Sequence, residues 1–226
     1  MKSVRQQRRD QYTKAGLTAF FDVVWEHLEG HRHPINPNKG NVVQAYQDAI
    51  RLAPLFAVEI SKVAAAVNAK SWLCRPGNGV KDAHRILEKA AKSQGKYVPK
   101  DLLGAKLIVT SLQEAYSIAA QLPKHLEVRE FHDRFLQPQP SGYRDLQFEV
   151  RFEALTAEVK ICHAQFDEAD SVKHRVYEIV RTLENRAVAL NRSERLLLEQ
   201  LRESSRQLYA AVWQDVLKAE RSDRYA

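Results

Sequence analysis

Two carboxylates in the middle of this 226-residue chain are placed where they could do chemistry. Asp101 precedes the apolar run AKLIVT at 105–110, and Glu158 lies among apolar neighbours in LTAEVKI at 155–161. A carboxylate that points from a strand into a ligand-binding face must be paired, protonated or bound to a metal. Two such groups with Mg²⁺ and a basic segment nearby are the parts of a phosphoryl- or nucleotidyl-type transfer site. The alternative is that Glu158 merely faces solvent from an amphipathic strand.

A basic segment of the kind that this chemistry needs runs from Lys70 to Lys106. It holds nine Lys and Arg residues against three acids, so it carries most of the chain's net charge of +7. Such an excess favours anionic partners such as nucleotides or RNA. The alternative is a solvated basic helix face, because runs of charge commonly lie on the surface.

The elements that must position these residues include about four strands in the middle of the chain. Patterns of β-branched and alternating apolar residues predict strands at 105–110, 126–131, 143–152 and 155–161. The last two are expected to form an antiparallel hairpin. Helices are expected at 80–92, which is basic, and at 111–122, where Ser111 and Glu114 form a capping box.

Both ends of the chain are predicted to be helical. Apolar residues at three- and four-residue spacing indicate helices at 10–29, at about 42–67 with Pro54 as the place for a kink, and in stripes at 172–190 and 196–217. One core is expected for a chain of this size. The order of elements predicts an α+β fold, in which a small mixed sheet of about four to five strands is flanked by N- and C-terminal helices.

Several classes of protein are excluded by composition. With 44% apolar and 28% charged residues the chain is a folded globular protein. The sequence holds no apolar run of the roughly 18 residues that a membrane span needs, and its first residues do not resemble a signal peptide, so a cytoplasmic location is expected. Cys74 and Cys162 have neither disulfide-framework nor zinc spacing. His31 and His33 would bind a metal only with ligands from elsewhere.

Four segments in order carry a resemblance to a known family. DLLGAKLIV at 101–109, VREFHDRF at 128–135, PSGYRDLQFEV at 140–150 and AEVKI at 157–161 resemble the successive motifs of the RelA/SpoT-type synthetase domain. The resemblance covers roughly residues 66–185. It therefore predicts an N-terminal helical region at 1–65, a synthetase core at 66–185 with a nucleotidyltransferase-like sheet, and a C-terminal helical extension at 186–226.

The resemblance implies pyrophosphate transfer, in which the β,γ-diphosphate of ATP moves to the 3′-hydroxyl of an acceptor nucleotide. Asp101 and Glu158 would hold Mg²⁺, and Glu158 would also help to deprotonate the hydroxyl. Tyr143 matches the aromatic residue that stacks on the acceptor base. The alternative for Tyr143 is a tyrosine that packs in the sheet.

The same resemblance implies which residues bind the two nucleotides. ATP would be bound by Arg75, Lys81, Arg85, Lys89 and Lys106, with either Arg85 or Lys89 as the last basic ligand, because Gly77 stands where the family commonly has a Lys. The acceptor would be bound by Tyr143, Arg144, Gln147, Lys160 and His174.

Three residues depart from the family pattern at these positions. Lys106 replaces an Arg, Gln147 replaces a His, and Lys160 replaces a Gln. Downstream, Lys173, His174, Tyr177 and Arg181 are spaced to share one helix face, which could border the acceptor or phosphate site.

The leading interpretation is thus a small stand-alone pyrophosphokinase that uses ATP and Mg²⁺. Its acceptor would be a guanine nucleotide or, as in the toxin branch of the family, the 3′ end of tRNA. The alternatives are a catalytically degenerate nucleotide- or RNA-binding module, and a helical adaptor. The terminal helices could also dock an antitoxin protein or a second subunit.

Overall fold

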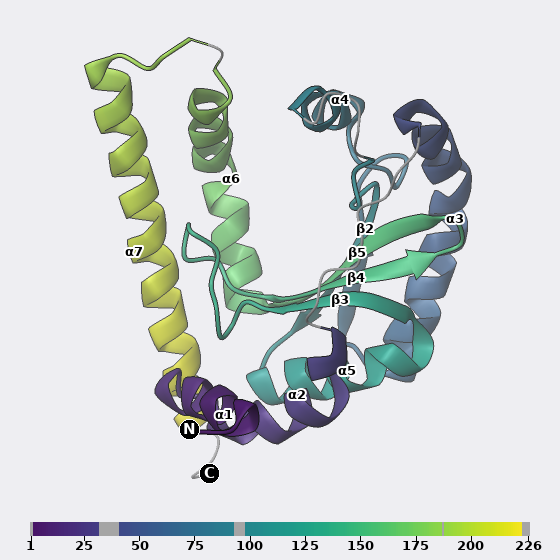
Figure 1. The fold of residues 1–226 in the computed structure, drawn as a ribbon, viewed down its shortest axis with the longest axis vertical. Helices are drawn as coiled ribbons and strands as arrows, with labels where there is room; N and C mark the ends of the chain where they lie inside the picture. Colours follow the sequence, from purple (N-terminus) through teal and green to yellow (C-terminus); the bar gives the residue numbers. More distant parts are fainter. Residues whose placement is uncertain (1, 32–40, 93–97, 187, 223–226) are drawn as a thin grey trace.

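A computed structural model describes residues 2–31, 41–92, 98–186 and 188–222 (Figure 1). Five strands form one mixed sheet: β1 (Ser71–Cys74), β2 (Leu103–Val109), β3 (Glu127–Asp133), β4 (Leu146–Phe152) and β5 (Leu155–His163). Their spatial order is β1-β2-β5-β4-β3. The pair β2–β5 is parallel, and the other neighbours are antiparallel. The α+β fold and the four strands predicted from the sequence are confirmed, including the β4–β5 hairpin.

Strand β1 was not predicted from the sequence. Its four residues are mostly exposed, so they show no alternation of buried and exposed positions. Its pairing with β2 makes it an edge strand. A short edge strand of this kind is specified by its neighbour rather than by its own pattern.

The N-terminal helices differ from the prediction in one respect. The single helix expected at 10–29 is wrong, because the chain forms α1 (Val4–Lys14), a 3₁₀ turn at Thr18–Phe20, α2 (Phe21–His27) and a second 3₁₀ turn at Glu29–His31. Gly16 separates α1 from the first turn with a φ of +76°, a left-handed conformation that glycine adopts without strain. Helix α3 (Val42–Ala66) continues through Pro54.

The remaining helices are α4 (Ala83–Lys92), α5 (Leu112–His125), α6 (Ala164–Glu184) and α7 (Arg192–Ser222). The Ser111 hydroxyl caps α5 by accepting from the Glu114 N–H at 3.1 Å. The other half of the expected capping box is shifted by one residue, because Glu114 accepts from the N–H of Thr110. Helices α6 and α7 lie side by side at one end of the sheet (Figure 1). Within the described residues, no helix is long and apolar enough to cross a membrane.

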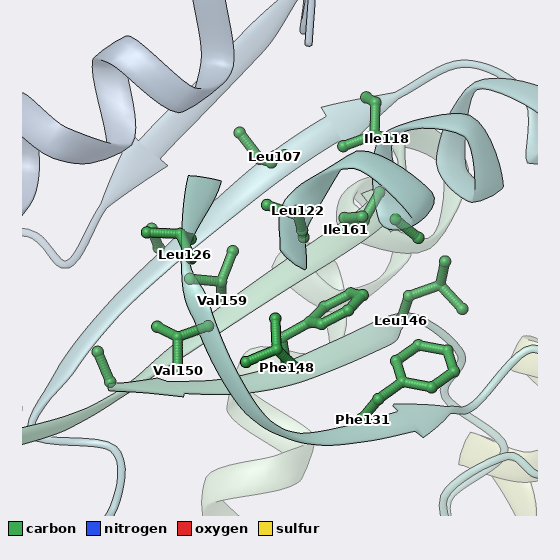
Figure 2. Packing of buried hydrophobic residues seen from close by; sticks show 14 of the residues in the cluster. Leu107, Ile118, Leu122, Leu126, Phe131, Leu146, Phe148, Val150, Val159 and Ile161 are labelled. Atoms are coloured by element: carbon green, nitrogen blue, oxygen red, sulfur yellow. The ribbon is translucent and has the colours of Figure 1, made fainter. Parts of the chain in front are cut away.

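The two faces of the sheet have different characters. Leu107, Phe148, Val159 and Ile161 belong to the buried core on the face where α5 contributes side chains such as Leu122 (Figure 2). The opposite face carries polar residues, since alternate positions of a strand point to opposite sides. The polar face is therefore the one available for a functional site.

The core includes residues from both ends of the chain. Buried side chains from Tyr12 to Val216 form one hydrophobic cluster. The Tyr12 hydroxyl donates to the buried carboxylate of Asp133 at 2.5 Å, and the Tyr116 hydroxyl donates to the same group at 3.1 Å. These bonds connect α1 and α5 to the end of β3. The division at residues 65 and 186 stays a prediction.

The start of α6 depends on a neutral histidine. His163 Nδ1 accepts from the Gln165 N–H at 3.3 Å, so its Nε2–H donates to the carbonyl of Thr110 at 3.0 Å. Burial lowers the pKa of His163 below the ordinary 6.5 and outweighs the opposing effect of the bond to Thr110. The unfolded chain therefore binds a proton more tightly than the folded chain.

We expect this histidine to make stability depend on pH. The contribution of neutral His163 should be complete above its unfolded pKa and should be lost as the pH falls through the lower folded pKa. Urea unfolding between about pH 8 and about pH 5 should show a steeper loss of unfolding free energy in the wild type than in His163→Asn. Asparagine keeps a helix-capping oxygen but does not titrate. Parallel pH profiles for the two proteins would contradict the assignment.

Candidate active site

A cleft of about 1340 Å³ lies at the polar face of the sheet. Its walls come from residues 75–85, from Asp101 and β2, from the middle of β5, from residues 139–143, and from α6 and α7. Nine Lys and Arg side chains line it against five Asp and Glu. This excess of positive charge in a concave site favours a polyanionic ligand.

The parallel pairing of β2 with β5 brings the two predicted acids to one place. Gly104 is paired with Glu158 and Lys106 with Lys160, and Asp101 lies just before β2. Both carboxylates line the cleft, and each side chain is only 16% exposed. Glu158 thus lies on the polar side of its strand, inside the cleft, and its role there stays a prediction.

The Arg75 guanidinium lies between the two carboxylates. Its Nη2 is 3.7 Å from Glu158 Oε1 and 4.0 Å from Asp101 Oδ2, and it donates to the Asp101 carbonyl at 3.1 Å. Lys81 forms a direct ion pair with Asp101 Oδ2. Positively charged groups of Arg75 and Lys81 thus lie beside the two carboxylates in this structure.

A missing side chain at Gly104 makes room for this guanidinium. A Cβ at Gly104 would be 2.9 Å from Arg75 Nε and 3.1 Å from Arg75 Cζ, which is closer than such atoms approach one another. The glycine of the DLLGAK segment is therefore required by the close approach of Arg75.

Glu158 has two further partners on its own face of the sheet. Lys160 Nζ lies 3.2 Å from Glu158 Oε1, and the Gln147 amide donates to Oε2. Burial alone would lower the pKa of Lys160, but the charges of Glu158 and Asp145 outweigh it and raise the pKa. Lys160 is therefore a permanent cation beside Glu158 at neutral pH. Gln147 is 8% exposed, and the described lining of the cleft does not include it.

Lys106 and Arg85 also line the cleft, and each forms an ion pair with α6. Lys106 Nζ is 2.7 Å from Asp167 Oδ1, and Arg85 pairs with Glu178. The side chains of Lys89 and His174 lie outside the residues that the structure describes. The choice between Arg85 and Lys89 therefore stays open.

Arg144 packs against α7 and the chain after β3. It donates to the carbonyl of Phe135, and its guanidinium carbon lies 4.5 Å from the centroid of the Trp213 ring. Its side chain is absent from the described lining of the cleft. This position fits a residue that packs α7 against the chain after β3, and an acceptor-binding role for Arg144 stays a prediction.

Tyr143 lines the cleft but is packed as a core residue. It is 7% exposed, and its ring makes edge contacts with Phe166 and Tyr209 at centroid distances of 6.0 and 5.5 Å. Its hydroxyl is 3.5 Å from Cys162 Sγ, and burial raises the pKa of that thiol to about 12. The structure thus supports the packing role that the sequence left as an alternative for this tyrosine.

Three basic cleft residues were not identified from the sequence: Arg134, Arg202 and Arg206. Arg134 is paired with the fully buried Asp145, and Arg202 with Glu184 across the α6–α7 hairpin. The four-residue spacing of Arg202 and Arg206 places both on one helix face, which is a signal that the sequence carried. Which way that face points depends on how α7 docks.

A second polar cluster lies on the same face of the sheet, outside the described lining of the cleft. Ligand atoms of Glu130, His132 and Glu149 lie within 4.8 Å of one another. Lys100 Nζ is 3.1 Å from Glu130 and 2.6 Å from Glu149, so an ammonium group already compensates both carboxylates. Burial raises the pKa of Glu149. We interpret this cluster as a structural ion pair.

The packing of Tyr143 generates a test of its role. Tyr143→Ala should reduce the free energy of unfolding by about 3–5 kcal/mol, as for other buried aromatic residues. Tyr143→Phe should cost less than about 1.5 kcal/mol, because it removes only the contact with Cys162. Urea unfolding measures both, with Tyr177→Ala as the control, since Tyr177 lines the same cleft but is 55% exposed. Wild-type stability in Tyr143→Ala would show that the ring is not part of the core.

Comparison with protein-family models and with curated proteins gives no match to this sequence. Solved structures do match. Small alarmone synthetase 2 from Bacillus subtilis aligns with a TM-score of 0.58 and 18% identity, over 79% of this chain and 97% of that one. Small alarmone synthetase 1 from the same organism, bound to its product pppGpp, gives 0.56 and 14%, over 80% and 95%.

A third match is an effector protein. The Type VI effector Tas1, in complex with its immunity protein, aligns with a TM-score of 0.50 and 18% identity, over 80% of this chain and 99% of that one. At these identities the likeness concerns the fold. The resemblance seen in the motifs is thus confirmed at that level: this chain has the fold of the small alarmone synthetases.

Proposed function

We propose that this protein is an ATP-dependent pyrophosphokinase. The observation that carries the proposal is the meeting of Asp101 and Glu158 around one cationic position, in a cleft whose lining is rich in Lys and Arg. The fold shared with small alarmone synthetases supports it. A pure binding site for polyphosphate has little reason to keep two carboxylates that repel the ligand.

Within this proposal the basic residues bind the ATP polyphosphate. Arg75, Lys81 and Arg85 approach the cleft from residues 75–85, and Lys106 approaches from β2. Arginine can hold a phosphate through two parallel hydrogen bonds, whereas lysine acts as a point charge. All four are paired with carboxylates in this structure. A bound polyphosphate would therefore replace these carboxylates as the partner of each cation.

Asp101 and Glu158 suit Mg²⁺ by the type of their ligand atoms, since Mg²⁺ prefers carboxylate and phosphate oxygens. The position between them is one where the structure places positive charge, at present the Arg75 guanidinium. Mg²⁺ bound there would disperse negative charge on the transferred group. Arg75 would then turn toward the phosphates.

The proposed reaction forms a bond between the acceptor 3′-oxygen and the β-phosphorus of ATP. The bond from that phosphorus to the oxygen shared with the α-phosphate breaks, and AMP leaves. The hydroxyl proton passes to Glu158, whose carboxylate is oriented by the Gln147 amide. Positioning and charge stabilisation would supply most of the rate enhancement, as is usual for transfer of phosphoryl groups.

The acceptor is proposed to be a guanine nucleotide or the 3′ end of tRNA. The same cleft is also lined by Lys173, Arg202 and Arg206 on α6 and α7, which add positive charge to that of the residues around the acidic pair. One structural match is an effector that was solved with an immunity protein. By analogy, an inhibitory protein partner or a second subunit stays a prediction for this chain.

The direct test uses purified protein, Mg²⁺ and γ-labelled ATP with GDP, GTP, ATP or bulk tRNA as separate acceptors. Label on one acceptor establishes both the activity and the acceptor. ATP binding without transfer to any of them would favour the degenerate binding module instead.

The acidic pair provides the first mutational test. Asp101→Asn and Glu158→Gln should each reduce transfer by about 100-fold or more, because each removes a charge that acts on the transferred group. Asp48→Asn, which alters a partly exposed carboxylate paired with Arg51 on α3, is the control. Transfer within about tenfold of wild type in either site variant, with thermal melting checked, would contradict the assignment.

Gly104 provides a test of Arg75. Gly104→Ala should leave the fold intact, because the atoms nearest to the added methyl group belong to the flexible end of the Arg75 side chain. Displacing that guanidinium should weaken ATP binding about tenfold, the worth of a charge-assisted hydrogen bond. Gly30→Ala is a matched control, since a Cβ at Gly30 meets nothing within 4 Å. Wild-type ATP affinity in Gly104→Ala would remove Arg75 from the binding site.

A further inference from the structure

We infer that Arg181 on α6 is a further ligand for a nucleotide polyphosphate chain, in a small pocket between α4 and α6 where Glu88 and Glu178 now take the place of phosphate. The inference rests on the proposed function. It identifies a phosphate-binding role for a residue outside the four motifs of the synthetase resemblance.

The pocket has a volume of about 260 Å³ and brings together cations from different segments. Lys81 comes from the segment before α4, Arg85 from α4, and Arg181 from the last turn of α6. The lining is completed by Glu88, Tyr177, Glu184 and Asn185. Lys81 and Arg85 also line the main cleft, so the two spaces are continuous through these side chains.

Each arginine of the pocket is paired with a carboxylate across the gap between the helices. Arg85 of α4 pairs with Glu178 of α6, and Arg181 of α6 pairs with Glu88 of α4. Arg181 also lies 3.9 Å from the second oxygen of Glu178. The guanidinium groups are thus already oriented toward anionic oxygens inside the pocket.

A polyphosphate can replace these carboxylates at small cost. The planar guanidinium fits carboxylate and phosphate oxygens with the same two-bond geometry. The side chains of Glu88 and Glu178 are 31% and 38% exposed, so they can turn into water, whereas Arg181 is 18% exposed and stays in place. The exchange leaves no buried charge without a partner.

Helix α4 is held in a way that permits this exchange. Of the side chains that the structure describes on α4, only Ile86 is buried, and Leu87 is 65% exposed. The polar pairs to α6 therefore contribute much of the attachment of its outer part. Replacing the carboxylates by a ligand would adjust α4 without opening the hydrophobic core.

The test depends on variants whose effects have opposite signs. Titration calorimetry with inorganic tripolyphosphate should show binding weakened about tenfold in Arg181→Gln, since a charged hydrogen-bond donor is lost. Binding should be tightened several-fold in Glu178→Gln and Glu88→Gln, because a competing anion is removed. If the ion pairs serve only to join α4 to α6, replacing the arginine or the glutamate of a pair would change tripolyphosphate affinity in the same direction. This result would overturn the inference.

Matched controls and a conservative variant keep the result interpretable. Arg186→Gln and Glu194→Gln break another ion pair near the same end of α6, whose members are outside the described lining of both pockets. They should bind tripolyphosphate as the wild type does. Arg181→Lys should recover part of the affinity, and thermal melting checks the fold of each variant. Equal effects of Arg181→Gln and Arg186→Gln would overturn the inference.

Two further titrations identify the source of the phosphate chain. Weakened binding of ATP but not of GDP in Arg181→Gln assigns the pocket to the donor, and the reverse assigns it to the 5′-diphosphate of the acceptor. No effect on either nucleotide would overturn the inference. Tripolyphosphate binding does not require the transfer reaction. If the Arg181 and glutamate variants change tripolyphosphate affinity in opposite directions while the wild type transfers no label, the phosphate pocket is supported and the proposed pyrophosphokinase function fails.

Discussion

The parallel pairing of β2 with β5 is the constraint on which the site depends. It places Gly104 opposite Glu158. The Arg75 guanidinium packs against Gly104, which has no side chain to block it. Asp101, at the entrance to β2, then lies on the other side of the same guanidinium. A register shift by one residue would turn Glu158 toward the core, where an acid without a partner is strongly unfavourable.

The charges around this pairing are balanced without a ligand. Lys81 compensates Asp101, while Arg75, Lys160 and the Gln147 amide surround Glu158. Such a network lets two carboxylates lie close together at moderate cost, because each has a donor of opposite charge. Binding of a polyanion would rearrange partners that already exist.

Helices α6 and α7 complete the cleft and stabilise its floor at the same time. Phe166 of α6 and Tyr209 of α7 are stacked at 6.0 Å, and both contact the ring of Tyr143. The Arg144 guanidinium lies over Trp213 and connects α7 to the preceding loop. Two adjacent residues of the GYRD segment, Tyr143 and Arg144, thus take part in packing, and Tyr143 also lines the cleft.

The sequence by itself determined the fold class and four of the five strands, because these depend on local alternation and on the order of motifs. It also singled out Asp101 and Glu158, which the structure brings to the same guanidinium. The sequence also identified the basic segment whose residues 75–85 form one wall of the cleft. Tertiary structure decided the rest. Edge pairing specified β1, docking of α6 and α7 brought Arg134, Arg202 and Arg206 into the cleft, and burial gave Tyr143 its packing role. The pairing of Arg181 with Glu88, 93 residues apart, depends on where the helices meet in space, and no local pattern carries that information.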